Sequence, residues 1–119
     1  MTDSITLYIL AHCSTCQRTA QALKDKGTRF EQRDIRARPL TRTEVANLAR
    51  LAGGASELFS RRALAYRERG LHERTIDEEE MIDLMTEQDT FIRRPVLLMG
   101  EQVIPGCTVR GLDKVLQER

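Results

Sequence analysis

Short apolar runs alternate along the chain with segments in which apolar residues recur every three or four positions. The first run, Ile5–Leu10, is apolar at almost every position, as expected of a central strand buried on both faces. A stretch with helical spacing follows and ends at Gly27, a residue typical of helix C-caps. Residues 28–35 predict a second strand, with Phe30 and Ile35 as its clearest apolar positions. Two strands joined by one helix should lie parallel, with a right-handed crossover.

The middle of the chain, about residues 41–90, predicts a block of helices inserted between the second and third strands. Thr41 and Glu44 have the spacing of a capping box and open the first helix, which the pair Gly53-Gly54 ends. The insert is therefore expected to begin with one helix that local signals bound at both ends.

Two more helices are expected in this insert. The first runs from Glu57 to Arg69 and has apolar residues on one face. Its expected inward residues are Leu58, Leu64 and Tyr66. The second helix starts at another capping-box pattern, Thr75 with Glu78, and continues through apolar residues at helical spacing.

The last part of the chain predicts two short strands and a final helix. Pro95 opens the strand Val96–Met99, residues 100–102 form a hairpin turn, and Val103–Ile104 return as the next strand. Apolar residues then recur at helical spacing near the C-terminus. The order βαβ, helical insert, ββα places the chain in the α/β class, and its 119 residues suit a single domain.

Composition narrows the range of functions. Lys and Arg number 19 and Asp and Glu 18, so no basic excess favours nucleic acid as a direct partner. No apolar run approaches the roughly 18 residues of a membrane span, and the N-terminus lacks the features of a signal peptide. We therefore expect no membrane partner and a cytoplasmic location, where structural disulfides are rare. The three cysteines are then better explained as reactive, metal-binding or buried.

Cys13 and Cys16 stand where the first expected strand gives way to the first helix. The free N–H groups of a helix's first turn and the positive end of its dipole stabilise a thiolate, so the pKa of Cys13 should fall. The same donors suit an oxyanion. Cys16 follows one helical turn later and lies near enough to close a disulfide. We expect exposed Cys13 to be the attacking thiol and Cys16 the resolving one.

The spacing of the cysteine pair also occurs in pairs that are simply buried and in zinc sites, and neither fits this chain as well. Two buried cysteines can share the spacing by chance, but the strand–helix junction of a βαβ unit is the context typical of a redox pair. A zinc site usually needs four Cys or His ligands, and only Cys107, His12 and His72 remain, none in paired spacing. We therefore expect no bound metal.

The cysteine pair, the Arg-Pro step and the helical insert together resemble the arsenate reductase (ArsC)/Spx family over nearly the whole chain. The matching residues are Leu7-Tyr8, Cys13-Ser14-Thr15-Cys16, Pro39-Leu40-Thr41 with Glu44, Arg62 with Tyr66, Arg93-Arg94-Pro95 and Val103-Ile104-Pro105-Gly106. The resemblance implies a thioredoxin-like fold with a helical insertion. It also implies a cis proline at Pro95, in a loop that lies against the Cys13 loop.

One activity that the resemblance implies is arsenate reduction. Cys13 matches the nucleophile, and Cys16 or a small thiol such as glutathione would resolve the intermediate. Arg94 and Arg62 match oxyanion-binding arginines, whose planar guanidinium groups pair well with tetrahedral anions. Ser14 and Thr15, between the two cysteines, complete the expected substrate-binding set. Glutathione or thioredoxin/glutaredoxin would supply the electrons, and no bound cofactor is expected.

The second activity is that of Spx, in which the Cys-x-x-Cys pair is a disulfide switch and the protein binds RNA polymerase. Cys16 favours this activity somewhat, because many glutaredoxin-dependent reductases lack a cysteine there. Those reductases also carry a third arginine near the C-terminal strand, where this chain has Pro105-Gly106-Cys107 and Arg110 is the nearest arginine. The turn at Gly53-Gly54 lies where the regulators present a glycine to their partner. We favour the enzyme, because it accommodates Cys16 by changing only the resolving step.

Cys107 follows the Pro105-Gly106 turn and has two interpretations. It is either a small buried residue at a strand end, which we favour, or a third redox thiol near the active loop. On the first interpretation, Cys107→Ser should keep most of the activity.

Overall fold

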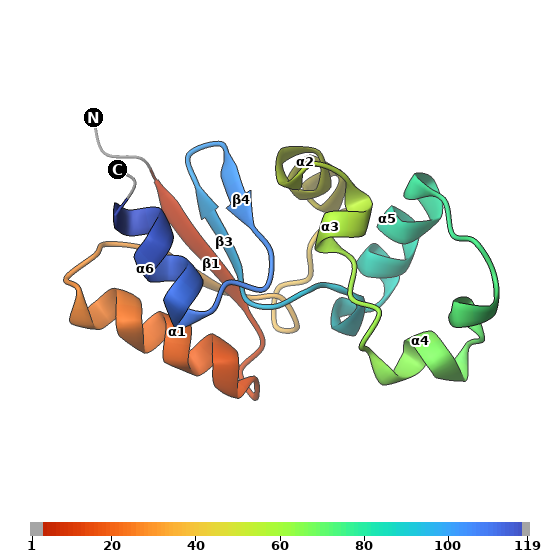
Figure 1. The fold of residues 1–119 in the computed structure, drawn as a ribbon, viewed down its shortest axis with the longest axis horizontal. Coiled ribbons are helices and arrows are strands. Elements are labelled where there is room, and N and C mark those ends of the chain that lie inside the picture. Colours follow the sequence, from red (N-terminus) through yellow and green to blue (C-terminus); the bar gives the residue numbers. More distant parts are fainter. Residues whose placement is uncertain (1–3, 118–119) are drawn as a thin grey trace. The chain divides into compact units, whose positions relative to one another are not determined.

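The computed structural model describes residues 4–117, and the chain divides into two compact units. One unit combines the segment up to Arg38 with the segment from Arg94 onward, and the other is the continuous stretch Pro39–Arg93. Figure 1 shows the strands in the first unit and helices with their connecting segments in the second. Within residues 4–117, we find no helix with the length and hydrophobicity of a membrane span.

The first unit holds a four-stranded sheet with the order β2-β1-β3-β4. Its elements are β1 (Ile5–Ile9), α1 (Ser14–Asp25), β2 (Glu31–Asp34), β3 (Val96–Met99), β4 (Gln102–Ile104) and α6 (Val109–Gln117). β1 pairs in parallel with β2 and antiparallel with β3, and β3 pairs antiparallel with β4. The βαβ and ββα arrangement of a thioredoxin-like α/β fold is therefore confirmed.

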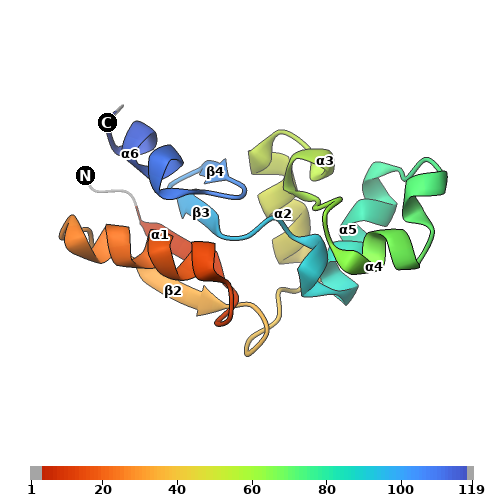
Figure 2. The same ribbon diagram turned by 60° about the horizontal axis from the view of Figure 1, so that its bottom comes forward.

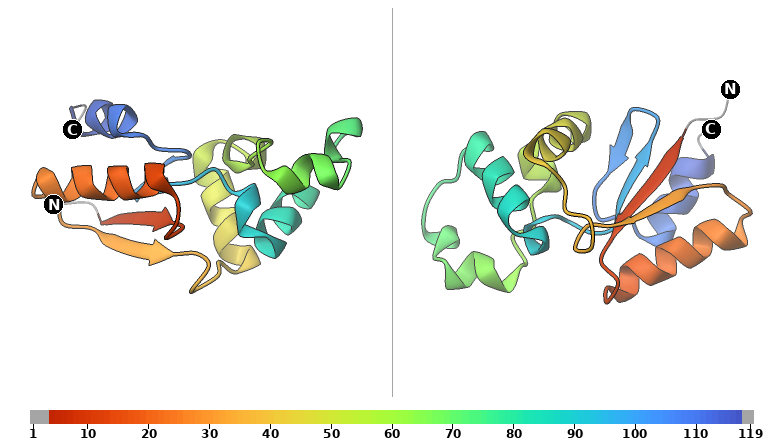
Figure 3. Two further views of the ribbon diagram at one scale, coloured as in Figure 1. Left: turned by 90° about the horizontal axis from the view of Figure 1, so that it is seen from below. Right: turned by 180° about the vertical axis from the view of Figure 1, so that it is seen from behind.

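Helices α1 and α6 lie on one face of this sheet (Figures 2 and 3). Side chains alternate between the two faces of a strand, so every second residue of β1 and β3 points towards these helices. The resulting core contains Ile5, Leu7, Ile9, Cys16, Ala20, Leu23, Leu97, Met99, Cys107, Leu112 and Val115. Two of the three cysteines are thus core residues.

Strand β2 is shorter than the sequence predicts and consists of polar residues. Of the expected strand over residues 28–35, only Glu31–Asp34 form it, and Phe30 and Ile35 flank it. β2 pairs on one side only, as the edge strand of the sheet, and its side chains are exposed or half-buried. An edge strand does not need the apolar composition of a central strand, so its hydrophobic signal is weak.

The second unit consists of short helices packed on a small aromatic and aliphatic core. Its elements are α2 (Arg42–Ala52), α3 (Ala55–Leu58), α4 (Leu64–Glu68), α5 (Glu78–Glu87) and the 3-10 turns Leu71–Glu73 and Asp89–Phe91. The rings of Phe59 and Phe91 stack with their centroids 5.3 Å apart. Val45, Leu48, Leu58 and Met85 are among the other residues that are buried in this unit.

The capping box predicted for the first inserted helix is confirmed. Thr41 Oγ1 accepts a hydrogen bond from Glu44 N at 3.1 Å, and Glu44 Oε1 accepts one from Thr41 N at 2.9 Å. Gly53 ends the helix in the left-handed conformation, with φ of 99°, which a residue with a side chain adopts only with strain.

The single helix expected over residues 57–69 is wrong. Helix α3 ends at Leu58, and Phe59 forms a β-bridge with Ile92. The next backbone N–H, that of Ser60, donates to Phe91 O at 2.6 Å, so these residues use their hydrogen bonds on a distant segment rather than on a helix. Leu64, expected to face inward, is 75% exposed.

The second capping box is also wrong. Asp77 caps α5, and its Oδ1 accepts from Glu80 N at 2.8 Å. Glu78 instead accepts from Ala55 N at 2.8 Å and so satisfies the first turn of α3. Thr75 lies outside the helix and is exposed. Aspartate is at least as good an N-cap as threonine, and its position two residues later sets the helix start.

Candidate active site

Cys13 is the N-cap of α1, at the point where the chain leaves the buried strand β1. Its backbone is extended, and its N–H donates to Leu10 O at 3.1 Å across a tight turn. Its sulfur accepts a hydrogen bond from Cys16 N at 3.3 Å. Gln17 Nε2 donates to Ala11 O at 2.7 Å and ties the same turn to the helix. The sulfur therefore faces the free N–H groups of the first helical turn, as the sequence predicts.

The surroundings of Cys13 favour its thiolate. Partial burial of the sulfur works to raise the pKa of Cys13, but the opposing influences outweigh it. These are hydrogen bonds from the side chain and N–H of Cys16, the positive charge of Arg94 and the N–H of Thr15. The net result is a lowered pKa, and a thiol with a lowered pKa is the more reactive nucleophile near neutral pH.

Cys16 has the opposite character. It is completely buried, and burial raises the pKa of its thiol to about 12, with the hydrogen bond to Cys13 and the negative charge of Cys13 adding to the effect. Cys16 therefore stays protonated while Cys13 is a thiolate. Bond formation at Cys13 would remove that negative charge, and the pKa of Cys16 would then fall when a second thiolate is needed.

The loop that precedes β3 packs against α1 through Cys107. The Arg94–Pro95 peptide is cis, as the family resemblance implied. Pro95 O accepts from Cys107 N at 2.8 Å, and Cys107 O accepts from Thr19 Oγ1 of α1 at 2.9 Å. These two hydrogen bonds hold the Arg94–Pro95 loop beside the helix that carries Cys13.

The side chain of Cys107 lies in the apolar core with 1% of its surface exposed. Burial raises the pKa of its thiol to about 11, so it is a poor nucleophile at neutral pH. Its environment supports the interpretation as a buried core residue. The backbone of Cys107 makes the hydrogen bonds to Pro95 and Thr19, whereas its S–H donates to Thr108 O at 3.6 Å.

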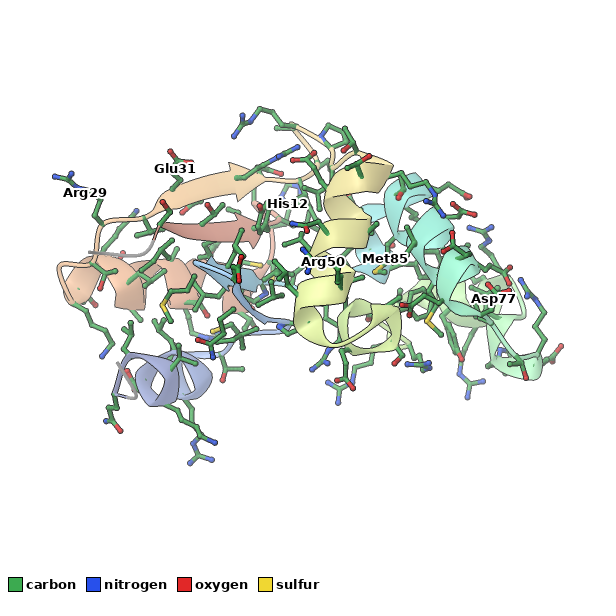
Figure 4. The ribbon with its side chains drawn as sticks, turned by 90° about the horizontal axis from the view of Figure 1, so that it is seen from above. His12, Arg29, Glu31, Arg50, Asp77 and Met85 are labelled. Atoms are coloured by element: carbon green, nitrogen blue, oxygen red, sulfur yellow. The ribbon has the colours of Figure 1, made fainter. Side chains whose placement is uncertain are left out.

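The remaining expected site residues occupy different places. Ser14 is exposed and Thr15 is half-buried in the first turn of α1, next to Cys13. Arg62 is an exposed residue of the second unit, between α3 and α4, where its N–H donates to Ser60 Oγ at 3.3 Å. Its part in an oxyanion site stays a prediction. His12, in the loop before Cys13, is exposed (Figure 4).

Thr19 is a site residue that sequence reasoning missed. It lies on the buried face of α1 with Cys16, Ala20 and Leu23. The sequence does contain one signal, because Thr19 is a polar residue within an apolar helix face. A buried hydroxyl at such a position requires a hydrogen-bond partner. That partner, Cys107, is 88 positions away and has no local sequence signal.

Three curated relatives align with most of this chain at low identity. Protein YusI of Bacillus subtilis (strain 168) is 27% identical over 87% of this chain and 90% of its own length. The regulatory protein MgsR of the same strain is 24% identical over 100% of this chain and 95% of its own. The global transcriptional regulator Spx of Streptococcus pneumoniae (strain ATCC BAA-255 / R6) is 24% identical over 83% of this chain and 75% of its own length.

The solved structures confirm the fold. The arsenate reductase from Vibrio cholerae superposes with a TM-score of 0.82 and covers 98% of both chains, at 19% sequence identity. The model of the ArsC family matches residues 8–108, which include both cysteines of the pair and the Arg94–Pro95 loop. Because this match covers most of the chain, the chain belongs to the ArsC family.

Proposed function

We propose that this protein is a thiol-dependent arsenate reductase in which Cys13 attacks arsenate and Cys16, or a small thiol, resolves the intermediate. The observation that carries the proposal is the Cys13 sulfur, which accepts a hydrogen bond from Cys16 N at 3.3 Å and is stabilised as a thiolate by Arg94. The pair has one reactive and one protected thiol, which is the division of roles that such a reaction requires.

The chemistry follows from these two thiols. The Cys13 thiolate forms an S–As bond, and one arsenate oxygen leaves as water after taking up protons. Cys16, once deprotonated, attacks the Cys13 sulfur, and the S–As bond breaks with its electron pair going to arsenic. Arsenic(V) becomes arsenic(III), released as arsenite, and the two thiols become a disulfide. A thiol donor, either glutathione or thioredoxin/glutaredoxin, then reduces the disulfide by exchange in the cytoplasm.

The anion would be held by charge and by free N–H donors. Arg94 is close enough to Cys13 for its charge to lower the pKa of that thiol, so a tetrahedral anion at the sulfur would also meet the guanidinium group. The N–H groups that follow Cys13, at Ser14 and Thr15, belong to the first turn of α1, where anions are stabilised. A part for Arg62, which belongs to the separate helical unit, stays a prediction from the family resemblance.

Arsenate turnover tests this function directly. The purified protein is incubated with arsenate and either a thioredoxin system or glutathione with glutaredoxin, and arsenite is quantified. We expect arsenite with at least one donor system, and at most a trace with Cys13→Ser. If neither system yields arsenite from the reduced wild-type protein, the proposal is wrong.

The alternative is a redox-switched regulator of the Spx type that binds RNA polymerase. Two observations favour it: the thiols of Cys13 and Cys16 are hydrogen-bonded to each other, and MgsR is named a regulatory protein. The left-handed Gly53-Gly54 turn is the expected contact with the polymerase. A pull-down with the oxidised and reduced protein separates the two functions, and absence of polymerase in both states would exclude this one.

A further inference from the structure

Thr19 is an exception within the core of the described part of the chain, where the buried residues are otherwise aliphatic, aromatic or sulfur-containing. Its exposed fraction is 0%, and its neighbours on the same helix face are apolar. Burying a hydroxyl group is unfavourable unless it makes a hydrogen bond, and valine has nearly the same shape without that cost. The presence of threonine at this position is therefore explained by its bond to Cys107 O, at 2.9 Å.

That bond is one of two that meet at the backbone of Cys107. The Cys107 carbonyl accepts from Thr19 on α1, and the Cys107 N–H donates to Pro95 O at 2.8 Å. Pro95 follows Arg94 directly, and Thr19 lies on the helix that begins at Cys13. A continuous path of hydrogen bonds thus joins the helix that carries the sulfur to the loop that carries the guanidinium group.

We propose that Thr19 is a positioning residue: its buried hydroxyl fixes Cys107, and through it the Arg94–Pro95 loop, against α1, and so keeps Arg94 beside the Cys13 sulfur. This inference rests on the proposed function, since it concerns the reactivity of Cys13. It assigns a role to the backbone of Cys107 while leaving the Cys107 sulfur without one.

The physical reason is that the attraction between the guanidinium charge and the thiolate weakens as their distance grows and as water enters between them. Without the Thr19 hydroxyl, the Cys107 carbonyl loses its partner in the core, and the adjoining loop can move away from α1 to reach another donor or water. Arg94 then lies farther from the sulfur, and the thiolate of Cys13 loses part of its stabilisation. The N–H donors of the first turn are unaffected, so the loss is partial.

The test measures the ionisation of Cys13 in Thr19 variants of the otherwise unchanged chain. Iodoacetamide alkylation of Cys13 is followed by mass spectrometry across a range of pH values, and the midpoint gives the pKa of this thiol. Thr19→Val should raise the midpoint and slow alkylation below it by about threefold or more, because only the thiolate reacts. Thr19→Ser keeps the hydroxyl and should keep the midpoint.

The double variant Thr19→Val with Arg94→Gln distinguishes the positioning role of Thr19 from a merely structural one. If Thr19 acts by placing the charge of Arg94, removing that charge first should abolish the further effect of Thr19→Val on the midpoint. Thr86→Val is the matched control, because Thr86 Oγ1 donates to Ile82 O at 2.7 Å within the second unit and its loss should leave the midpoint unchanged.

The inference is overturned if folded Thr19→Val has the wild-type midpoint, or if it shifts the midpoint equally with and without Arg94. Should Thr19→Val fail to fold, Thr19→Ala against Thr19→Ser decides by the same criteria. A wild-type midpoint at the ordinary value for cysteine would instead refute the proposed function, and this inference with it.

Discussion

At the scale of single residues, the site makes two chemically identical side chains behave differently. Cys13 and Cys16 are three positions apart, yet one has a lowered pKa and the other a pKa raised to about 12. The difference comes from their places on α1: the N-cap position faces free N–H groups, while the position one turn later faces the core. A spacing of three residues is enough to produce both environments.

The first prediction concerns the roles of these two thiols. Cys13→Ser should lower kcat/KM for arsenate by about a thousandfold or more, because the hydroxyl is not ionised at neutral pH. Cys16→Ser should still react once with arsenate and turn over only when glutathione is added as the resolving thiol. Single-turnover and steady-state assays measure the two effects, and equal losses in both variants would contradict this division of roles.

The second prediction concerns Arg94. Arg94→Lys keeps the positive charge but loses the planar pair of donors, so KM for arsenate should rise by about tenfold while the pKa of Cys13 stays lowered. Arg94→Gln removes the charge and should raise both KM for arsenate and the pKa of Cys13. The steady-state KM and the pH dependence of thiol alkylation are the measurements. A Lys variant with wild-type KM would mean that Arg94 does not bind the anion in a bidentate manner.

The third prediction concerns Cys107. Cys107→Ser should keep most of the arsenate-reducing activity, because the sulfur is buried and protonated and both functional hydrogen bonds come from the backbone. The readout is kcat/KM relative to the wild-type protein at a temperature where both are folded. A loss as large as that of Cys13→Ser would identify Cys107 as a redox thiol.

At the scale of elements, the sequence was informative where the signal is local. The capping box at Thr41 and the left-handed Gly53 bound α2 as predicted, since each depends on residues within one helical turn. The helix expected to begin at Glu57 failed, because Phe59 pairs with Ile92 and this pairing is not visible in the local sequence. Tertiary contacts override helical propensity there.

The candidate site shows the same contrast. Cys13 and Cys16 could be found from their spacing and position, and Arg94 and Pro95 from the family resemblance. Thr19 could not be assigned, because its partner is 88 positions away. The proximity of Arg94 and Cys13 likewise depends on the pairing of β1 with β3. This pairing joins segments that lie before and after the helical insert in the sequence.

The fourth prediction tests the start of α5. Asp77→Ala should lower the free energy of unfolding by about 1 kcal/mol, because the first turn loses the hydrogen bond that Asp77 Oδ1 accepts from Glu80 N. Thr75→Ala is the matched control and should change it by no more than about 0.5 kcal/mol, as for an ordinary exposed position. Urea unfolding of the two variants measures both, and the reverse order would restore Thr75 as the cap.

At the scale of the whole molecule, the three thiols couple stability to pH. The lowered pKa of Cys13 stabilises the folded state above the pKa of an unfolded cysteine, and this contribution is lost as the pH falls through the folded value. Cys16 and Cys107, with pKa values of about 12 and 11, act in the opposite sense. Their contribution is complete below the unfolded value and is lost as the pH rises through the folded value.

The fifth prediction follows from those signs. Under reducing conditions, the wild-type protein should lose stability relative to Cys107→Ser as the pH rises from about 8.5, the ordinary value for cysteine, towards about 11. The difference should grow by up to about 1.4 kcal/mol per pH unit, because the unfolded thiol ionises and the buried one does not. Urea unfolding at several pH values measures it, and a constant difference would mean that burial does not raise the pKa of Cys107.

The helical unit Pro39–Arg93 is continuous in the chain, whereas the sheet-containing unit is assembled from the two segments on either side of it. Domains that are complete in the nascent chain can fold during synthesis. The helical unit is therefore fully synthesised before the sheet-containing unit. Until β3 is made, β1 and the segment with Cys13 and Cys16 lack their partner strand. An oxidant that reacts before β3 is made would meet Cys13 without Arg94 and Cys107. The Cys13 thiol therefore gains its full reactivity only after the segment that contains these two residues has been synthesised.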